Sequence, residues 1–160
     1  MPRVLVQRFR VSPEAMDVNG HVNNLAYLRW MQEAAIAHST ARGWPVERYL
    51  AAGTGWVVRS HFIEYLLPAF AGEELCLLTW VAELRRKSSL RKFMFWREHD
   101  RQVLARAETL WVFVESASGR PVPIPPDLVS AFEVVPPGED VLALLRPGDA
   151  AGPIPVEGTP

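Results

Sequence analysis

The residues best suited to chemistry stand close together, between positions 16 and 27 of the 160-residue chain. The acid of this segment is Asp17, and Asn19, His21 and Asn24 follow it within seven positions. A carboxylate can attack a carbonyl carbon or activate a water molecule for that attack. His21 could orient the carboxylate, bind the substrate or hold the loop, and Asn19 could fix the carboxylate or a water molecule. Asp17 is therefore the candidate nucleophile or general base.

The same segment also fits a purely structural role as a turn and helix cap. Asp and Asn favour turns, Gly20 permits a positive φ, and Asn23 or Asn24 can satisfy free amides at a helix start. What favours chemistry is the helix that follows, which is the most apolar in the chain. The start of a buried helix presents backbone N–H groups and a positive dipole end that can stabilise an oxyanion. We predict the amide near Asn24 as that donor.

A thioester is the substrate that such a site suits. Its carbonyl lacks much of the resonance of an ester or amide. Its leaving thiol, with a pKa of about 8.5 by analogy with cysteine, departs as a thiolate without an acid. A complete nucleophile–base–acid triad is therefore unnecessary.

A cluster of cations, Arg85-Arg86-Lys87 followed by Ser88, lies between two expected strands. The chain as a whole has 17 Lys and Arg against 18 Asp and Glu, so bulk charge attracts neither nucleic acid nor an anionic membrane. The cluster is either a solvated hairpin turn or a site for an anion. Coenzyme A carries a pyrophosphate and a ribose phosphate that Arg and Lys side chains match. If the cluster is an anion site, these four residues are the predicted contacts of CoA.

The elements that must position these residues follow from the hydrophobic pattern. Residues Val4 to Val11 alternate as a strand, and about Ala26 to Arg42 form a helix so apolar that other elements should enclose it. Turn-type residues separate the later strands, which predicts that successive strands are antiparallel neighbours. This order gives an α+β domain with one helix against one sheet. The four later strands are expected at Trp56–Leu67, Glu74–Leu84, Leu90–His99 and Val103–Glu115.

The C-terminal part changes composition after Gly119 and becomes rich in Pro and Gly. A short helix is possible over Asp127–Phe132, and residues from Val135 onward are expected to be extended or disordered. We predict a domain over residues 1–134 and an extension over residues 135–160. The strand before this region is apolar on both faces, so one face can hold the helix and the other can meet a partner.

Several other classes of protein are disfavoured. Cys76 lies in an apolar run and is predicted to be a buried structural thiol. The four His residues lack the paired spacing of a zinc site, and no Gly-x-Ser-x-Gly elbow or phosphate-binding glycine motif is present. The tryptophans fit a core or an interface better than nucleic-acid stacking. No long apolar N-terminal stretch is seen, so a cytoplasmic protein that binds neither nucleic acid nor membrane is expected.

The segment matches a pattern, Asp-x-x-Gly-His-Val-Asn-Asn-x-x-Tyr, that ends at Tyr27. With this pattern the chain resembles the hotdog-fold acyl-CoA thioesterases of the hydroxybenzoyl-CoA thioesterase type. The similarity runs from about Val4 to Glu115. It includes Arg29-Trp30, Gly53-Thr54, and Glu64-Tyr65-Leu66-Leu67-Pro68 through Gly72-Glu73.

The resemblance implies a hotdog fold, in which a five-stranded antiparallel sheet wraps a long central helix. It also implies a homodimer or homotetramer with active sites at the dimer interface. Asp17 would then be the catalytic carboxylate, the amide near Asn24 would polarise the thioester carbonyl, and the basic cluster would bind the nucleotide. Substrate contacts would come from Tyr27, Glu33, Thr54 and Gly55.

The reaction so implied uses acyl-CoA as substrate and needs no cofactor or metal. Gln32-Glu33 stands where hydroxybenzoyl-CoA enzymes carry an acid that contacts the substrate ring, so hydroxybenzoyl specificity is not expected to transfer. Two alternatives share the fold, namely a dehydratase or hydratase and a non-catalytic acyl-CoA-binding protein.

Overall fold

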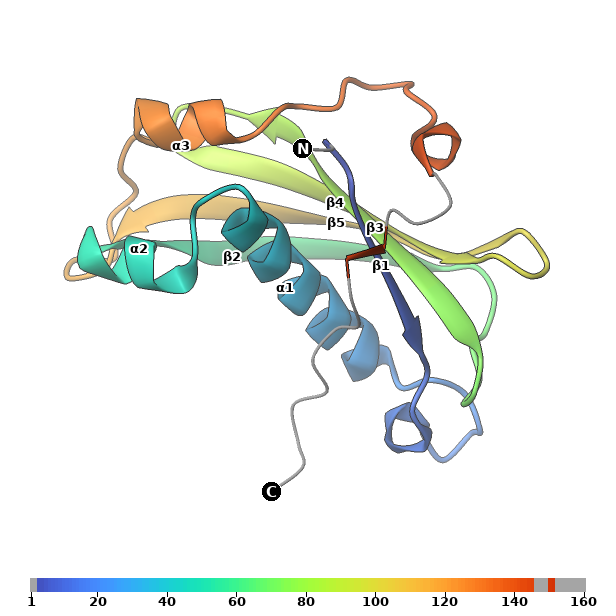
Figure 1. The fold of residues 1–160 in the computed structure, drawn as a ribbon. Helices are drawn as coiled ribbons and strands as arrows, with labels where there is room; N and C mark the ends of the chain where they lie inside the picture. The colour runs from blue at the N-terminus through green and yellow to red at the C-terminus, as the bar shows by residue number, and fades with distance from the viewer. Residues whose placement is uncertain (1–2, 146–149, 152–160) are drawn as a thin grey trace.

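The computed structural model of the protein describes residues 3–145 and 150–151. A long helix, α1 (Asn24–Ala41), crosses one face of a sheet of five antiparallel strands (Figure 1). The predicted α+β architecture is confirmed, with strands β1 (Leu5–Arg10), β2 (Thr54–Tyr65), β3 (Glu74–Leu84), β4 (Ser88–Arg97) and β5 (Gln102–Glu115). The smaller elements are η1 (Pro13–Ala15), α2 (Val46–Ala51), α3 (Pro126–Ala131), η2 (Val141–Leu144) and β6 (Ala150–Ala151). β6 pairs with β1 in parallel and was not predicted.

The order of strands across the sheet is β2-β5-β4-β3-β1-β6. The prediction that every strand pairs with the next one is therefore wrong for β2 and β3. The β3–β4 and β4–β5 connections are short enough to make hairpins, which pair as neighbours. The longer connection, residues 66–73, carries the chain past these two hairpins, and β2 pairs with β5 at the sheet edge instead.

One face of α1 packs on the sheet, and the opposite face does not. Its buried residues meet the inward side chains of β3, β4 and β5, where successive residues alternate between the two faces. The members of this core include Tyr27, Met31, Ala34, Ala35, Leu75, Leu77, Phe93, Phe95 and Leu104. The expectation that other elements enclose α1 is wrong within a single chain, because a stripe remains exposed, formed by Leu25, Arg29, Gln32, Ile36 and Thr40.

The outer face of the sheet is covered in part by the chain itself. Val135 and Val141 are buried there against the outward residues of β1, β3 and β4, among them Cys76. The N–H of Val135 also donates to the carbonyl of Val81 at 2.9 Å, and Arg3 pairs with Glu139. We expected an extended or disordered segment here, but Val135 and Val141 pack on the sheet because their side chains complete this second core. The rest of the predicted extension, residues 146–149 and 152–160, lies outside the described residues.

Cys76 is confirmed as a buried thiol, and burial raises its pKa to about 11. In the part of the chain that the structure describes, no helix has the length and hydropathy needed to cross a membrane.

Candidate active site

Asp17 lies in a tight loop immediately before α1. Its carboxylate oxygen Oδ1 accepts hydrogen bonds from the backbone N–H groups of Asn19 at 2.8 Å and His21 at 3.2 Å. The loop is closed by a bond from the Asp17 N–H to the His21 carbonyl at 2.7 Å, and Gly20 adopts a φ of 74° that residues with a side chain rarely take. Oδ2 of Asp17 makes no hydrogen bond within the described residues. The loop therefore fixes the carboxylate by one oxygen and leaves the other available.

Asn23 is the N-cap of α1 and directly precedes its first turn. Its side-chain oxygen accepts the N–H of Leu25 at 2.9 Å, and its carbonyl accepts the N–H of Ala26 at 2.9 Å. Among the described residues, no hydrogen bond uses the N–H of Asn24, the first residue of the helix. That amide sits at the positive end of an 18-residue helix, close in sequence to Asp17. The capping and catalytic interpretations of this segment are thus compatible, since the cap leaves one donor unused.

The other residues predicted for this segment have different surroundings. Asn19 and His21 hold Asp17 through their backbones, and the His21 ring packs edge-on against Phe70 with centroids 5.7 Å apart. Tyr27 is only 3% exposed, and its ring contacts the buried ring of Phe95 and the exposed ring of Tyr65. This burial raises the pKa of Tyr27 to about 12. In a single chain, Tyr27 therefore packs the helix start against the sheet.

The Asp17 loop rests on the connection between β2 and β3. The N–H of Val22 donates to the carbonyl of Ala69 at 3.0 Å, and Val11 and Gly72 are joined by a bond of 2.8 Å. Phe70, which contacts the His21 ring, belongs to the same connection. The position of Asp17 therefore depends on how residues 68–73 are held.

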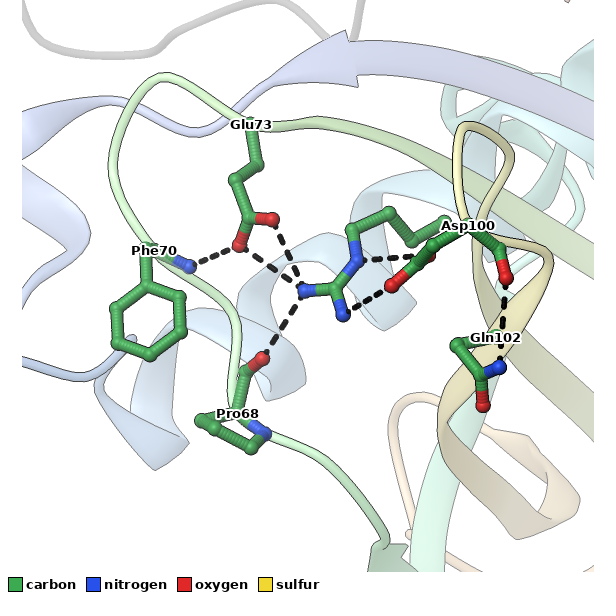
Figure 2. Close-up of polar contacts among 6 residues, drawn as sticks. Pro68, Phe70, Glu73, Asp100 and Gln102 are labelled. Atoms are coloured by element: carbon green, nitrogen blue, oxygen red, sulfur yellow. Dashed lines mark hydrogen bonds and ion pairs between the residues drawn. The ribbon is translucent and has the colours of Figure 1, made fainter.

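Arg97 near the end of β4 holds that connection in place (Figure 2). Its Nη1 donates to the carboxylate of Glu73 at 2.9 Å and to the carbonyl of Pro68 at 3.3 Å, while Nε and Nη2 donate to Asp100 at 3.0 and 2.7 Å. Glu73 in turn accepts the N–H of Phe70 at 2.7 Å. The hydrogen bonds from Arg97 lower the pKa of Asp100. Sequence reasoning missed this network, although the acid three residues after Arg97 was a visible signal.

A cavity of about 460 Å³ lies at the other end of α1. It is bounded by the second half of α1, by α2 and α3, and by the start of β2, with aromatic side chains such as Trp44, Trp56 and Phe132 in its wall. Two predicted substrate contacts, Thr54 and Gly55, also line it.

Asp17 does not reach this cavity within its own chain. The first α1 residue that lines the cavity is Gln32, eight positions after Asn24, which corresponds to about 12 Å along a helix. Glu33, the remaining predicted contact, lies half-buried beside Gln32. One chain thus places the predicted catalytic residues at one end of α1 and two of the predicted substrate contacts at the other.

Arg91, which sequence reasoning also missed, reaches the wall of this cavity from β4. The side chain of Arg91 is buried, and its Nη1 donates to His38 Nδ1 at 2.9 Å and to Thr79 Oγ1 at 3.1 Å. Burial lowers the pKa of His38 to about 3, assisted by the positive charge of Arg91, so the imidazole is neutral. The alternation of β4 was a usable signal, because it places Arg91 on the same face as Phe93 and Phe95.

The predicted basic cluster forms the turn between β3 and β4. The side chains of Arg85, Arg86 and Lys87 are exposed, and Arg85 pairs with Glu83 at 3.2 Å. Leu84 and Ser89, on either side of the turn, line the cavity. Ser88 is half-buried at the start of β4. The cluster therefore lies at the cavity end of the sheet.

Comparison with known proteins identifies the family of this chain. The family model of the thioesterase-like superfamily matches residues 11–132. The chain belongs to this superfamily. None of the curated proteins searched matches it. Within the described residues, no three His, Cys, Asp or Glu side chains gather as a metal site would require.

Solved structures of thioesterases share this superfamily member's fold. A 1,4-dihydroxy-2-naphthoyl-CoA thioesterase from Synechocystis is 18% identical with a TM-score of 0.74, covering 80% of this chain and 94% of its own. A 4-hydroxybenzoyl-CoA thioesterase mutant complexed with 4-hydroxybenzoyl-CoA is 22% identical with a TM-score of 0.77, covering 82% and 100%. A putative oleoyl thioesterase from Lactobacillus plantarum is 24% identical with a TM-score of 0.77, covering 83% and 52%. The predicted hotdog fold is thereby confirmed.

Arg97→Gln should lower the free energy of unfolding by about 2 kcal/mol, because Glu73 and Asp100 lose their charged hydrogen-bond partner. Urea denaturation at fixed protein concentration measures this change. Hydrogen exchange at the Val22 amide, which is bonded to Ala69, should become faster as the connection loosens. The matched control is Arg106→Gln, an exposed position on β5, for which a change below about 0.5 kcal/mol is expected. Equal effects of the two substitutions would contradict this role.

His38 should make stability depend on pH in acid. Its folded pKa of about 3 lies below its ordinary value of 6.5, so its contribution is complete above pH 6.5 and is lost progressively as the pH falls toward 3. Between pH 7 and 4.5 the wild type should therefore lose about 2 kcal/mol more stability than His38→Gln does. Urea titrations at several pH values test this, with His99→Gln at an exposed turn as the control. Parallel pH profiles for wild type and His38→Gln would disprove it.

Proposed function

We propose that this protein hydrolyses acyl-CoA thioesters to a carboxylic acid and free CoA. The observation that carries the proposal is a carboxylate fixed by two backbone amides, Asp17, in the loop that leads to an unused backbone donor at the helix start, the amide of Asn24. Membership of the thioesterase-like superfamily and structural similarity to named CoA thioesterases support it.

In the proposed reaction the substrate carbonyl lies against the start of α1. The N–H of Asn24 donates to the carbonyl oxygen and stabilises the negative charge that develops there. As a nucleophile, Asp17 attacks the carbon through Oδ2, CoA leaves as a thiolate, and water then hydrolyses the resulting anhydride. As a general base, Asp17 takes a proton from a water molecule that attacks directly. In both routes one C–S bond breaks and one C–O bond to the product acid forms.

A second copy of the chain is the proposed partner. β2 is a long edge strand whose exposed side chains include Val57, Val58, Phe62 and Tyr65, and Phe62 is 63% exposed. Such an edge is an aggregation hazard unless another strand covers it. A symmetric antiparallel pairing of β2 with β2 of the partner subunit would cover both edges with one interface.

This pairing would also complete the active site. The start of β2 lines the cavity, and the end of β2 leads into the connection on which the Asp17 loop rests. An antiparallel partner strand would bring the start of one β2 near the end of the other. Asp17 of each subunit would then face the cavity of its partner, and Thr54 and Gly55 could contact a substrate held at Asp17.

The basic turn is proposed to bind the nucleotide of CoA. Arg86 and Lys87 are exposed beside the cavity, and Arg85 is only partly neutralised by Glu83. Phosphates remain hydrated at such a surface while the acyl group enters the cavity. The reaction proposed uses no cofactor, and a cytoplasmic location stays a prediction.

Purified protein should release free thiol from one or more members of a panel of acyl-CoA thioesters. Asp17→Asn should lower turnover by at least about a hundredfold, because the amide neither attacks the carbonyl nor accepts a proton from water. A thiol-reactive dye measures the release, and circular dichroism checks the fold. Glu14→Gln, an exposed acid just before the loop, is the control.

Other outcomes identify other functions. Binding of acyl-CoA without thiol release would favour a binding protein. Hydration of an enoyl-CoA without thiol release would favour a hydratase. Unchanged turnover in Asp17→Asn would remove Asp17 from the mechanism.

The protein should sediment with at least twice the 18.0 kDa mass of the chain. Phe62→Asp places a charge in the proposed interface and should shift the protein toward monomer, and thiol release should fall with it. Val134→Asp, also an exposed apolar position, should leave the mass unchanged. Analytical ultracentrifugation over a range of concentrations makes the comparison. A wild-type monomer at all concentrations would refute the pairing.

A further inference from the structure

The cavity contains a charge without a counter-charge. Arg91 is the one charged side chain that lines it in the described part of the chain, and Arg91 is 5% exposed. No acidic side chain among the described residues pairs with it. Its hydrogen bonds at Nη1 go to neutral acceptors, His38 and Thr79. A buried guanidinium without an anion is costly, so its presence needs an explanation.

Arg97, an arginine with a structural role, differs from Arg91 in its partners. Arg97 is also largely buried, and two carboxylates, Glu73 and Asp100, receive its N–H groups. Arg91 has the same donors but no such partner. Among the described residues, the hydrogen-bond partners of Arg91 are His38 and Thr79, both at Nη1, and its guanidinium carbon also lies 5.9 Å from the centroid of the Phe132 ring.

Arg91 lines the cavity and has donors that are not used within the protein. Its Nε and Nη2 make no hydrogen bond within the described residues, and neither is among the polar atoms sealed from solvent without a partner. The guanidinium carries donors only, so this part of the wall offers N–H groups to an acceptor-rich ligand.

The rest of the cavity wall indicates the chemistry of the ligand that carries this hydrogen-bond acceptor. Trp44, Trp56, Phe132 and other apolar side chains line most of the cavity. Such a wall suits a hydrocarbon chain or ring, with the charged end at Arg91. The phosphates of CoA are a poorer match for this apolar space than for the exposed Arg85-Arg86-Lys87 turn.

We propose that Arg91 binds a carboxylate at the far end of the acyl group, and that the substrates are thioesters of dicarboxylic acids. This inference rests on the proposed thioesterase function and names its substrate class. Arg91 is a specificity-determining residue and takes no part in breaking the thioester bond. A carboxylate can accept two parallel N–H bonds from one guanidinium, which the free Nε and Nη2 allow.

The experiment compares pairs of CoA thioesters that differ only at the end of the chain. Succinyl-, glutaryl- and adipyl-CoA are each matched with butanoyl-, pentanoyl- and hexanoyl-CoA. For at least one pair, the wild type should favour the dicarboxylic member by about tenfold or more in kcat/KM. Arg91→Met should abolish that ratio, Arg91→Lys should keep part of it, and Lys92→Met, the neighbouring position on β4, should keep all of it.

Each outcome separates the inference from the proposed function. If the wild type hydrolyses the monocarboxylic members equally well or better, the inference is wrong and the thioesterase function stands. If no member of either series or of the wider acyl-CoA panel releases thiol, the proposed function itself fails. If Arg91→Met does not fold, as judged by circular dichroism, the wild-type ratio and Arg91→Lys still decide.

Pantetheine thioesters of the same acids identify which anion Arg91 binds. These compounds lack the nucleotide phosphates, so the preference for the dicarboxylic member should persist with them. If Arg91→Lys instead raises KM for both CoA members of a pair and leaves both pantetheine members unchanged, Arg91 binds a CoA phosphate, and the inference is overturned.

Discussion

The packing of one face of α1 against the sheet is the constraint on which the rest of the structure depends. Small residues such as Ala34, which is fully buried, let the helix approach β3, β4 and β5 closely. That contact fixes both ends of the helix at once. At its start the Asn23 cap and the Asp17 loop are placed against the end of the sheet, and along its second half the cavity opens. Both features associated with chemistry are therefore consequences of a single packing interface.

Arg91, which is buried, and Arg97, which is half-buried, show how charge is used in this framework. Arg97 donates to the carboxylates of Glu73 and Asp100 and to the carbonyl of Pro68. These bonds hold the connection that contacts the Asp17 loop. Arg91 faces an apolar cavity, and its neighbours Thr79 and His38 are uncharged. Because burial keeps His38 neutral, it can accept a hydrogen bond from Arg91 without adding a second positive charge. The difference in partners, more than the difference in burial, distinguishes a scaffolding arginine from one available to a ligand.

Local patterns in the sequence predicted local structure well. The Asp17–Tyr27 segment, the extent of α1 and the positions of the five long strands follow from turn chemistry and periodicity, which act over a few residues. The strand order did not follow, because the pairing of β2 with β5 is decided by packing between residues about fifty positions apart. The Arg97 network and the cavity depend on the same long-range arrangement. The packing of residues 135–145 was not predicted, because a Pro-rich composition is typical of extended or disordered chain. Two of their side chains, Val135 and Val141, complete the outer core.

Three features of the single chain are those expected of one subunit of a dimer. The exposed stripe of α1, the apolar edge of β2 and the separation of Asp17 from the cavity are independent observations. Each could have a separate explanation, such as a solvated helix face or a strand blunted by charge. A twofold pairing along β2 would address the edge and the separation together, because antiparallel strands place unlike ends side by side. It would also explain why Thr54 lines a cavity that Asp17 of the same chain does not reach.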